Sequence, residues 1–169
     1  RPGGQDMRSG EEVLTPGTTL VSGQLGLLAA AGARNVLVHR RPRVGIIANG
    51  DELAAPGDYH RVLAGKAIPE TNSTALAAAV SASGGIPLPL GIARDTRESI
   101  LDRVTAAREE GADFLQTSGG ASMGEKDLLK RVLEEIGFEL DFWRVKIRPG
   151  TPFSFGFLPR QGDDPTLPV

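Results

Sequence analysis

From residue 41 onward, segments whose apolar residues have the spacing of a strand alternate with segments whose apolar residues have the spacing of a helix. Short runs typical of strands, β-branched or alternating, occur at 43–50, 85–93, 113–120, 139–150 and 153–159. Apolar residues recur at helical spacing in three segments, 71–83, 93–111 and 125–137. Strands that alternate with helices predict an α/β fold with a mostly parallel sheet and helices on both of its faces.

Two of the expected helices carry a continuous apolar stripe. The stripe of segment 93–111 consists of Ile100, Leu101, Val104 and Ala107. The stripe of segment 125–137 consists of Leu128, Leu129, Val132, Leu133 and Ile136. The alanine-rich segment 71–83 is expected to be capped by Thr71 or Asn72.

Residues 1–40 do not follow this alternation. Ser22 is expected to cap a helix in which Leu25, Leu28 and Ala29 share a face, and residues 36–38 are expected to form a short strand. The opening RPGGQDMRSG is rich in turn-forming residues. Because this part is too small for a core of its own, we expect residues 1–40 to be a remnant or connecting segment of a preceding domain, and 41–169 to be the main domain.

Composition narrows the class of protein. With 169 residues, 40% of them hydrophobic and 24% charged, the chain matches an ordinary soluble domain. A formal charge of −2 argues against general nucleic-acid binding. The absence of cysteine excludes disulfides and thiolate metal sites. No stretch has the length of a membrane helix, so we expect a cytoplasmic protein without a membrane partner.

Two polar loops directly follow expected strands. One is the NGDEL sequence at residues 49–53, and the other is TSGGASMGEKD at 117–127. In a parallel sheet, ligands collect at the carboxyl ends of the strands, so both loops are candidate binding sites. The glycines, the serines and the following helix N-terminus of the second loop suit a phosphate or another oxyanion. Neither a P-loop nor a GxGxxG spacing is present.

Carboxylates accompany both loops. Asp51 and Glu52, beside a phosphate site, suggest a Mg²⁺ ion that bridges carboxylate and phosphate oxygens. Solvent-exposed charges in a turn would give the same pattern, and Glu125 and Asp127 could equally stabilise a helix N-terminus.

One strand also carries a row of cations. In WRVKIRPGTP, the side chains of Trp143, Val145 and Ile147 are expected to face inward, which turns three cations to the other face: Arg144, Lys146 and Arg148. Arg148, beside the Pro-Gly turn, is the best candidate for an anion ligand.

Four motifs together resemble the molybdopterin molybdenumtransferase family, of the MoeA and gephyrin E-domain type. They are RPRVGIIANGDELAAPG, ETNS, TSGGASMGEKD and FWRVKIRPGTPFSFG, over about residues 41–157. The preceding stretch also resembles the family segment that leads into this domain. The resemblance implies the three-layer αβα molybdopterin-binding fold, in an elongated homodimer.

The family inserts molybdate into adenylylated molybdopterin and releases AMP in a reaction that needs Mg²⁺. By resemblance, the catalytic and metal-binding residues are Asp51, Glu52 and Asp127. By the same resemblance, the residues that bind the molybdopterin or its phosphates are Ser118, Gly119, Gly120, Ser122, Asn72 and Arg148. A molybdopterin adenylyltransferase is a further expected partner.

Two departures from the family pattern bear on activity. Thr151 replaces the second basic residue of the family's xPGxP motif. The chain also stops before the family's GLPGNP-type turn and C-terminal domain, so we expect a fragment that binds ligand without completing the insertion alone. The alternatives are a molybdopterin adenylyltransferase of the same fold, a CinA-like nucleotide hydrolase, and a gephyrin-like scaffold or binding module.

Overall fold

The computed structural model describes residues 4–119, 128–148, 153–159, 161–162 and 165–169. Contacts divide the chain into two compact units, Arg1–Arg40 and Arg41–Val169. No helix within the described residues is long and apolar enough to cross a membrane.

The first unit contains one helix, α1 (Ser22–Ala30), among its described residues. The expected cap is wrong, because Val21 precedes the helix and no side chain caps it. Residues 36–38 are not a strand in the structure, and Leu37 is fully exposed. A strand needs a hydrogen-bonded neighbour, and no described segment of this unit provides one.

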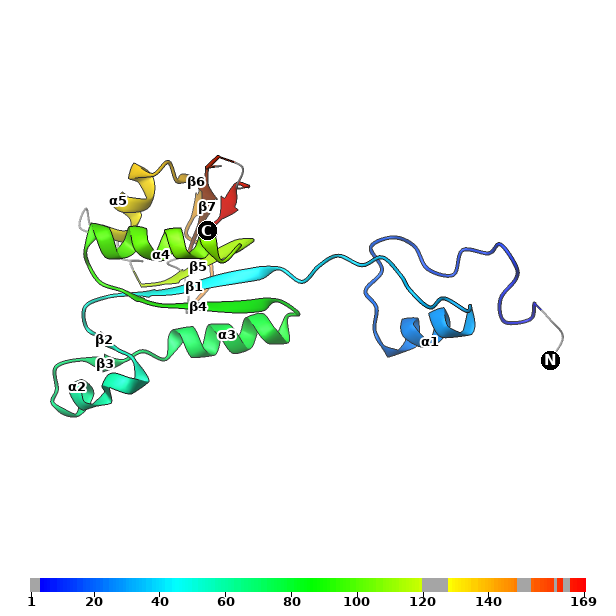
Figure 1. Cartoon of the computed structure of the whole chain (residues 1–169), viewed down its shortest axis with the longest axis horizontal. Coiled ribbons are helices and arrows are strands. Elements are labelled where there is room, and N and C mark those ends of the chain that lie inside the picture. The colour runs from blue at the N-terminus through cyan, green and yellow to red at the C-terminus, as the bar shows by residue number, and fades with distance from the viewer. Residues whose placement is uncertain (1–3, 120–127, 149–152, 160, 163–164) are drawn as a thin grey trace. The chain divides into compact units, whose positions relative to one another are not determined.

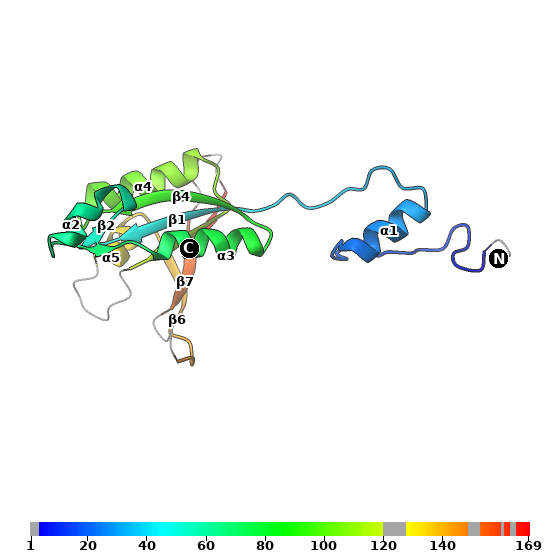
Figure 2. The same ribbon diagram turned by 90° about the horizontal axis from the view of Figure 1, so that it is seen from below.

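A three-stranded parallel sheet forms the centre of the second unit. β1 (Arg43–Asn49) lies between β4 (Ile86–Ala93) and β5 (Phe114–Ser118). Figures 1 and 2 show α3 (Asn72–Ala82) along one face of the sheet and α4 (Arg97–Glu109) along the other. Since β1 is covered on both sides, its side chains are buried almost without alternation. The predicted parallel sheet between helices is confirmed.

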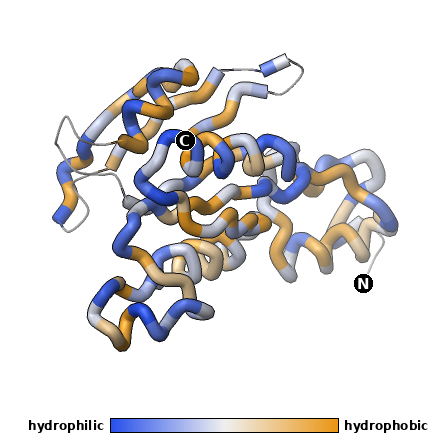
Figure 3. Tube along the Cα trace, turned by 60° about the vertical axis from the view of Figure 1, so that its left-hand side comes forward, coloured by the Kyte–Doolittle hydropathy of each residue, from blue (hydrophilic) through white to orange (hydrophobic). Residues whose placement is uncertain are grey.

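The core lies between the sheet, α4 and α5 (Leu128–Glu135). The predicted stripes are confirmed, because Ile100 and Val104 of α4 and Leu129 and Val132 of α5 are buried in one cluster. Figure 3 shows the hydrophobic stretches on the strands and an alternation of hydrophobic and hydrophilic residues along helices. The part of helix 125–137 that precedes residue 128 lies outside the described residues.

Residues 51–70, for which the sequence predicted no helix or strand, contain regular structure. Its elements are β2 (Leu53–Ala54), the short 3₁₀ helix η1 (Pro56–Asp58), α2 (Tyr59–Leu63) and β3 (Ile68–Pro69). β2 and β3 pair in parallel and lie beyond the end of β1, as Figure 1 shows. Two-residue strands leave no readable period in a sequence, which explains why they were not predicted.

A second, antiparallel sheet follows α5. It consists of β6 (Glu139–Trp143), β7 (Ser154–Leu158) and β8 (Leu167–Pro168). The expected strand 139–150 ends early, because Arg144 takes a φ of +70°, a left-handed conformation that no strand continues through. The predicted inward faces of Trp143 and Ile147 are therefore wrong, since these side chains are 42% and 56% exposed.

Candidate functional site

The carboxyl ends of β1 and β5 lie side by side. Ala48 pairs with Ser118 in the parallel register, so the two predicted loops begin at the same edge of the sheet. Gly119 has a φ of +104°, and a Cβ atom there would come closer than 3.0 Å to the carbonyl oxygen of Asn49. This glycine is therefore required by the contact between the two strand ends. The remaining predicted residues of this loop, Gly120, Ser122 and Asp127, lie outside the described residues.

A carboxylate that follows β4 holds the turn that follows β1. Nδ2 of Asn49 donates to Oδ1 of Asp95 at 2.8 Å, and the Asp51 N–H donates to Oδ2 of Asp95 at 3.3 Å. The Asp95 N–H in turn donates to Oδ1 of Asp51 at 3.2 Å. The backbone N–H of Gly50 adds a bond to the carbonyl of Ala93 at 3.1 Å. Both ends of the Asn49–Gly50–Asp51 turn are thus tied to the end of the neighbouring strand.

Two arginines bind the carbonyl groups of the same loop. Nη1 of Arg94 donates to the carbonyl oxygens of Asp51 at 3.2 Å and Leu53 at 3.1 Å. Arg61 of α2 reaches the same two carbonyls at 3.4 and 3.3 Å. These bonds satisfy backbone groups that would otherwise have no strand partner.

Asp51 and Glu52 themselves are exposed at this edge. Oδ1 of Asp51 is occupied by the Asp95 N–H, whereas no hydrogen bond from a described residue reaches Oδ2 of Asp51 or the Glu52 carboxylate. Oxygen donors of this kind fit Mg²⁺. They are only part of a coordination shell, since no group of three or more potential metal ligands converges within the described residues.

The segment that contains Asn72 is tied to this loop through the backbone. The Ile68 N–H donates to the carbonyl of Glu52 at 2.8 Å, two residues before the segment reaches Glu70. Oε1 of Glu70 accepts from the Ser73 N–H at 2.8 Å, so Glu70 supplies the capping bond of α3 that was expected from Thr71 or Asn72. Asn72 is exposed at the start of α3.

Arg148 belongs to a different part of the second unit. It is exposed after the turn that follows β6, and no hydrogen bond or ion pair with a described residue links it to the edge at β1. Its neighbour in the motif, Thr151, lies outside the described residues. The structure therefore brings the segments of Asp51, Glu52, Ser118 and Gly119 to one edge, whereas no hydrogen bond or ion pair between described residues links Arg148 to it.

Sequence analysis missed three side chains that organise this edge: Asn49, Arg94 and Asp95. The signal was present, because the Arg94–Asp95 dipeptide directly follows the strand 86–93. The rule that singled out the other two loops applies equally to this strand end.

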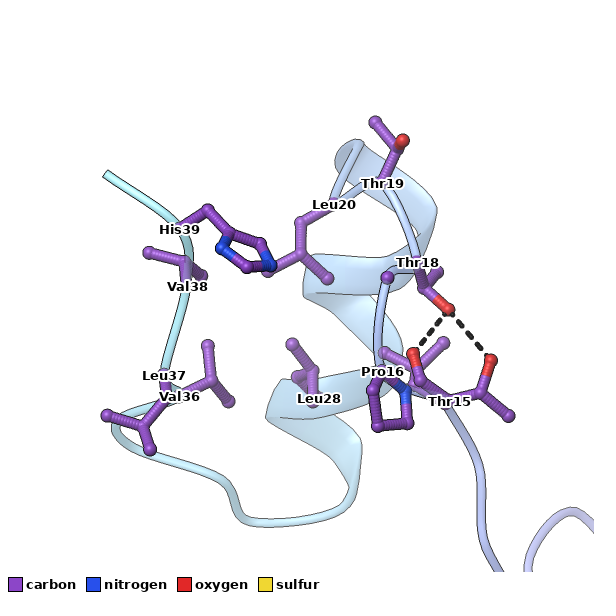
Figure 4. Close-up of a pocket in the computed structure, with 12 residues that line it drawn as sticks. Thr15, Pro16, Thr18, Thr19, Leu20, Leu28, Val36, Leu37, Val38 and His39 are labelled. Atoms are coloured by element: carbon purple, nitrogen blue, oxygen red, sulfur yellow. Dashed lines mark hydrogen bonds between the residues drawn. The ribbon is translucent and has the colours of Figure 1, made fainter. Parts of the chain in front are cut away.

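A separate pocket lies within the first unit (Figure 4). It has a volume of about 720 Å³ and is lined by residues 14–20, 28 and 36–39. Its side chains are mostly apolar, and the hydrogen bonds drawn there join Thr18 to Thr15. None of the predicted site residues lines it, so the candidate site remains the edge formed by β1, β4 and β5.

Residues 45–166 match the family described as "Probable molybdopterin binding domain". The molybdopterin molybdenumtransferase of Haemophilus influenzae is 36% identical over 92% of this chain and 37% of its own length. The protein of the same name from Bacillus subtilis is 37% identical over 88% of this chain and 34% of its own length.

A solved structure of similar fold is the molybdopterin biosynthesis MoeA protein of Pyrococcus horikoshii OT3. It shares 29% identity, with a TM-score of 0.68 over 98% of this chain and 37% of that protein. The chain thus spans little more than a third of the length of the relatives it matches.

Proposed function

Because the chain belongs to the family of molybdopterin-binding domains, we propose that its second unit binds a pterin nucleotide in molybdenum cofactor biosynthesis. The substrates would be adenylylated molybdopterin and molybdate, and AMP would leave as molybdenum is inserted. One observation carries the proposal: the acidic turn after β1 and the glycine turn after β5 lie at one edge of the sheet.

In this proposal, the glycine turn holds the phosphate groups. Ser118 offers a hydroxyl at the end of β5, and Gly119 lets the chain leave the sheet directly beside Asn49. Gly120 and Ser122 would continue the same cradle. Asn72 and Arg148 would add polar contacts to the pterin nucleotide from other elements.

Asp51 and Glu52 would hold Mg²⁺ together with Asp127. When bound, Mg²⁺ neutralises the charge that develops on the phosphoanhydride. The free Oδ2 of Asp51 and the unbonded Glu52 carboxylate support this role, because they can accept a cation without breaking a hydrogen bond to a described residue.

We further propose that these 169 residues bind the nucleotide without completing the insertion, as the relatives are about two and a half times as long. Homodimerisation and docking of a molybdopterin adenylyltransferase belong to the same proposal. The names of the relatives favour a molybdenumtransferase over an adenylyltransferase of this fold.

Calorimetric titration of the chain with adenylylated molybdopterin, with and without Mg²⁺, tests the proposal. We expect micromolar binding that Mg²⁺ strengthens, and we expect Asp51→Asn to lose this gain. Asp102→Asn is the matched control. Asp102 is exposed on α4, so this substitution removes one negative charge as Asp51→Asn does, but away from the edge. Absence of nucleotide binding in both conditions would overturn the proposal.

A further inference from the structure

We propose that one face of the β6–β7 pair is a docking surface for an acidic segment of a partner protein that also carries apolar side chains. This phenylalanine face consists of Phe114, Phe142, Phe153, Phe155 and Phe157. The proposal is independent of the proposed function, because none of the residues assigned to nucleotide or metal binding forms part of this face.

The five rings form one continuous cluster. Residues 153, 155 and 157 alternate along β7, so their side chains share one face of the sheet, and Phe142 of β6 lies opposite Phe155. The ring centroid of Phe155 lies 5.7 Å from that of Phe142 and 5.1 Å from that of Phe157. Phe142 and Phe153 are 5.9 Å apart, and Phe114 of β5 lies 6.3 Å from Phe155. Five of the chain's six phenylalanines are therefore gathered in one place.

The outer rings of this face are exposed. Phe153 is 50% exposed and Phe142 is 40% exposed, whereas Phe155 is half-buried. Figure 2 shows the β6–β7 pair extending away from the central parallel sheet. Single exposed apolar side chains are ordinary, but a contiguous exposed patch of them marks an interaction surface. Aromatic residues and arginine are also enriched at such surfaces.

A cationic border adjoins the phenylalanine face. Residues 144–148 carry three cations and no acid, in a chain whose formal net charge is −2. The border is continuous with the face, because the Arg144 N–H donates to the Phe153 carbonyl at 2.7 Å. The Arg144 guanidinium stacks on the Trp143 ring at 4.5 Å, which holds this cation at the end of β6. Lys146 is exposed, and no hydrogen bond or ion pair from a described residue reaches it. A carboxylate of the partner supplies the complementary charge.

The backbone of β6 favours recognition through side chains over pairing with a strand of a second copy. β6 is the outer strand of its sheet within the described residues, but its pairing with β7 shifts register between Leu140 and Phe142. Arg144 then leaves the strand with a φ of +70°. Irregularities of this kind protect an edge strand against pairing with another chain. The apolar side chains of an incoming segment would instead pack on Phe142 and Phe153, with its carboxylates beside Lys146.

A nuclear magnetic resonance titration of the whole isotope-labelled chain tests the proposal. The probes are two unlabelled, acetylated peptides, one of sequence Asp-Phe-Asp-Leu-Glu-Leu and one with lysine in place of each acid. We expect the acidic peptide to shift the backbone amide signals of β6 and β7. We expect the lysine peptide to bind at least about tenfold more weakly, because its charges repel the cationic border. Equal affinity for both peptides, or no binding of the acidic one, would overturn the proposal.

Two variants separate the apolar contact from the charge. Phe153→Ala removes the most exposed ring of the face and should weaken binding of the acidic peptide about tenfold, as loss of an aromatic anchor does. Lys146→Glu should weaken the acidic peptide and strengthen the lysine peptide, and it serves if Phe153→Ala does not fold. The matched controls are Leu63→Ala and Lys66→Glu, at exposed positions on and after α2, away from β6 and β7 (Figure 1). Unchanged affinity in both test variants would contradict docking at this face.

Sedimentation velocity distinguishes a second copy of the chain from a separate partner. We expect Phe153→Ala to leave the association state of the chain unchanged at every concentration. Self-association that Phe153→Ala abolishes would make a second copy the occupant of the phenylalanine face and would overturn the proposal.

Discussion

Replacement of Gly119 by alanine is the sharpest test of the edge between β1 and β5. The residue has a φ of +104°, and the added Cβ would meet the backbone carbonyl of Asn49 closer than 3.0 Å. The left-handed conformation alone costs about 1–3 kcal/mol for a residue with a Cβ atom. Relief of the clash by movement of packed backbone adds about 1–3 kcal/mol. We therefore expect Gly119→Ala to lower the free energy of unfolding by about 2–6 kcal/mol.

Gly111→Ala is the matched control, because Gly111 has a φ of +65° and its added Cβ would meet no atom within 4 Å. It should carry the conformational cost without the clash, about 1–2 kcal/mol. Urea denaturation of both variants, followed by far-UV circular dichroism, measures the difference. If Gly119→Ala were no less stable than Gly111→Ala, the close contact between the strand ends would be refuted.

Further stability predictions use urea denaturation of the same chain. Leu115→Ala should cost about 2–5 kcal/mol, since Leu115 is 0% exposed in the core; a cost below about 1 kcal/mol would contradict this packing. Glu70→Ala should cost about 1 kcal/mol through loss of the bond to the Ser73 N–H. Thr71→Ala should cost much less, because its side chain makes no capping bond; equal costs would contradict the assigned cap. Gly156→Ala should disrupt the β6–β7 pair, since its Cβ would press on the Glu139 carbonyl; an unchanged near-UV signal of Trp143 would oppose this.

The parts of the fold that sequence predicted are those where burial follows a local period. β1 is covered on both faces, so its apolar run is continuous, and α4 turns Ile100, Val104 and Ala107 into the core. The spacing of buried residues in these elements is set by the geometry of the strand or helix itself, so it can be read without knowing which element packs against it.

The errors arose where tertiary partners decide the outcome. Residues 36–38 have strand-forming side chains but no strand beside them among the described residues. β6 ends at Trp143 because the Arg144 backbone is left-handed, although the Arg144 N–H still bonds the Phe153 carbonyl at 2.7 Å. A non-glycine residue in that conformation gives no sequence signal, since every common residue type can occupy it at a cost.

The candidate site shows the same division. The order of strands and helices was enough to place the loops after β1 and β5 at one edge, because parallel strands share the direction of their carboxyl ends. The order of elements could not show why position 119 is a glycine, which is the close approach of the Asn49 carbonyl and not the space that a ligand needs. That distinction depends on a contact between residues 70 positions apart in the sequence.

The hydrogen bonds at this edge also distinguish the carboxylates of Asp51 and Asp95 as possible contacts for a cation. A cation that approaches Asp51 meets an oxygen with no described donor and a backbone already held by Arg94 and Arg61. The loop would therefore lose little conformational entropy when the cation binds, and such pre-organisation increases affinity. Both carboxylate oxygens of Asp95 already accept a hydrogen bond, one of them from the Asn49 amide, whose Oδ1 atom is buried without a hydrogen-bond partner among the described residues. The two aspartates are close in space and alike in chemistry, but of their four carboxylate oxygens only Oδ2 of Asp51 accepts no hydrogen bond from a described residue.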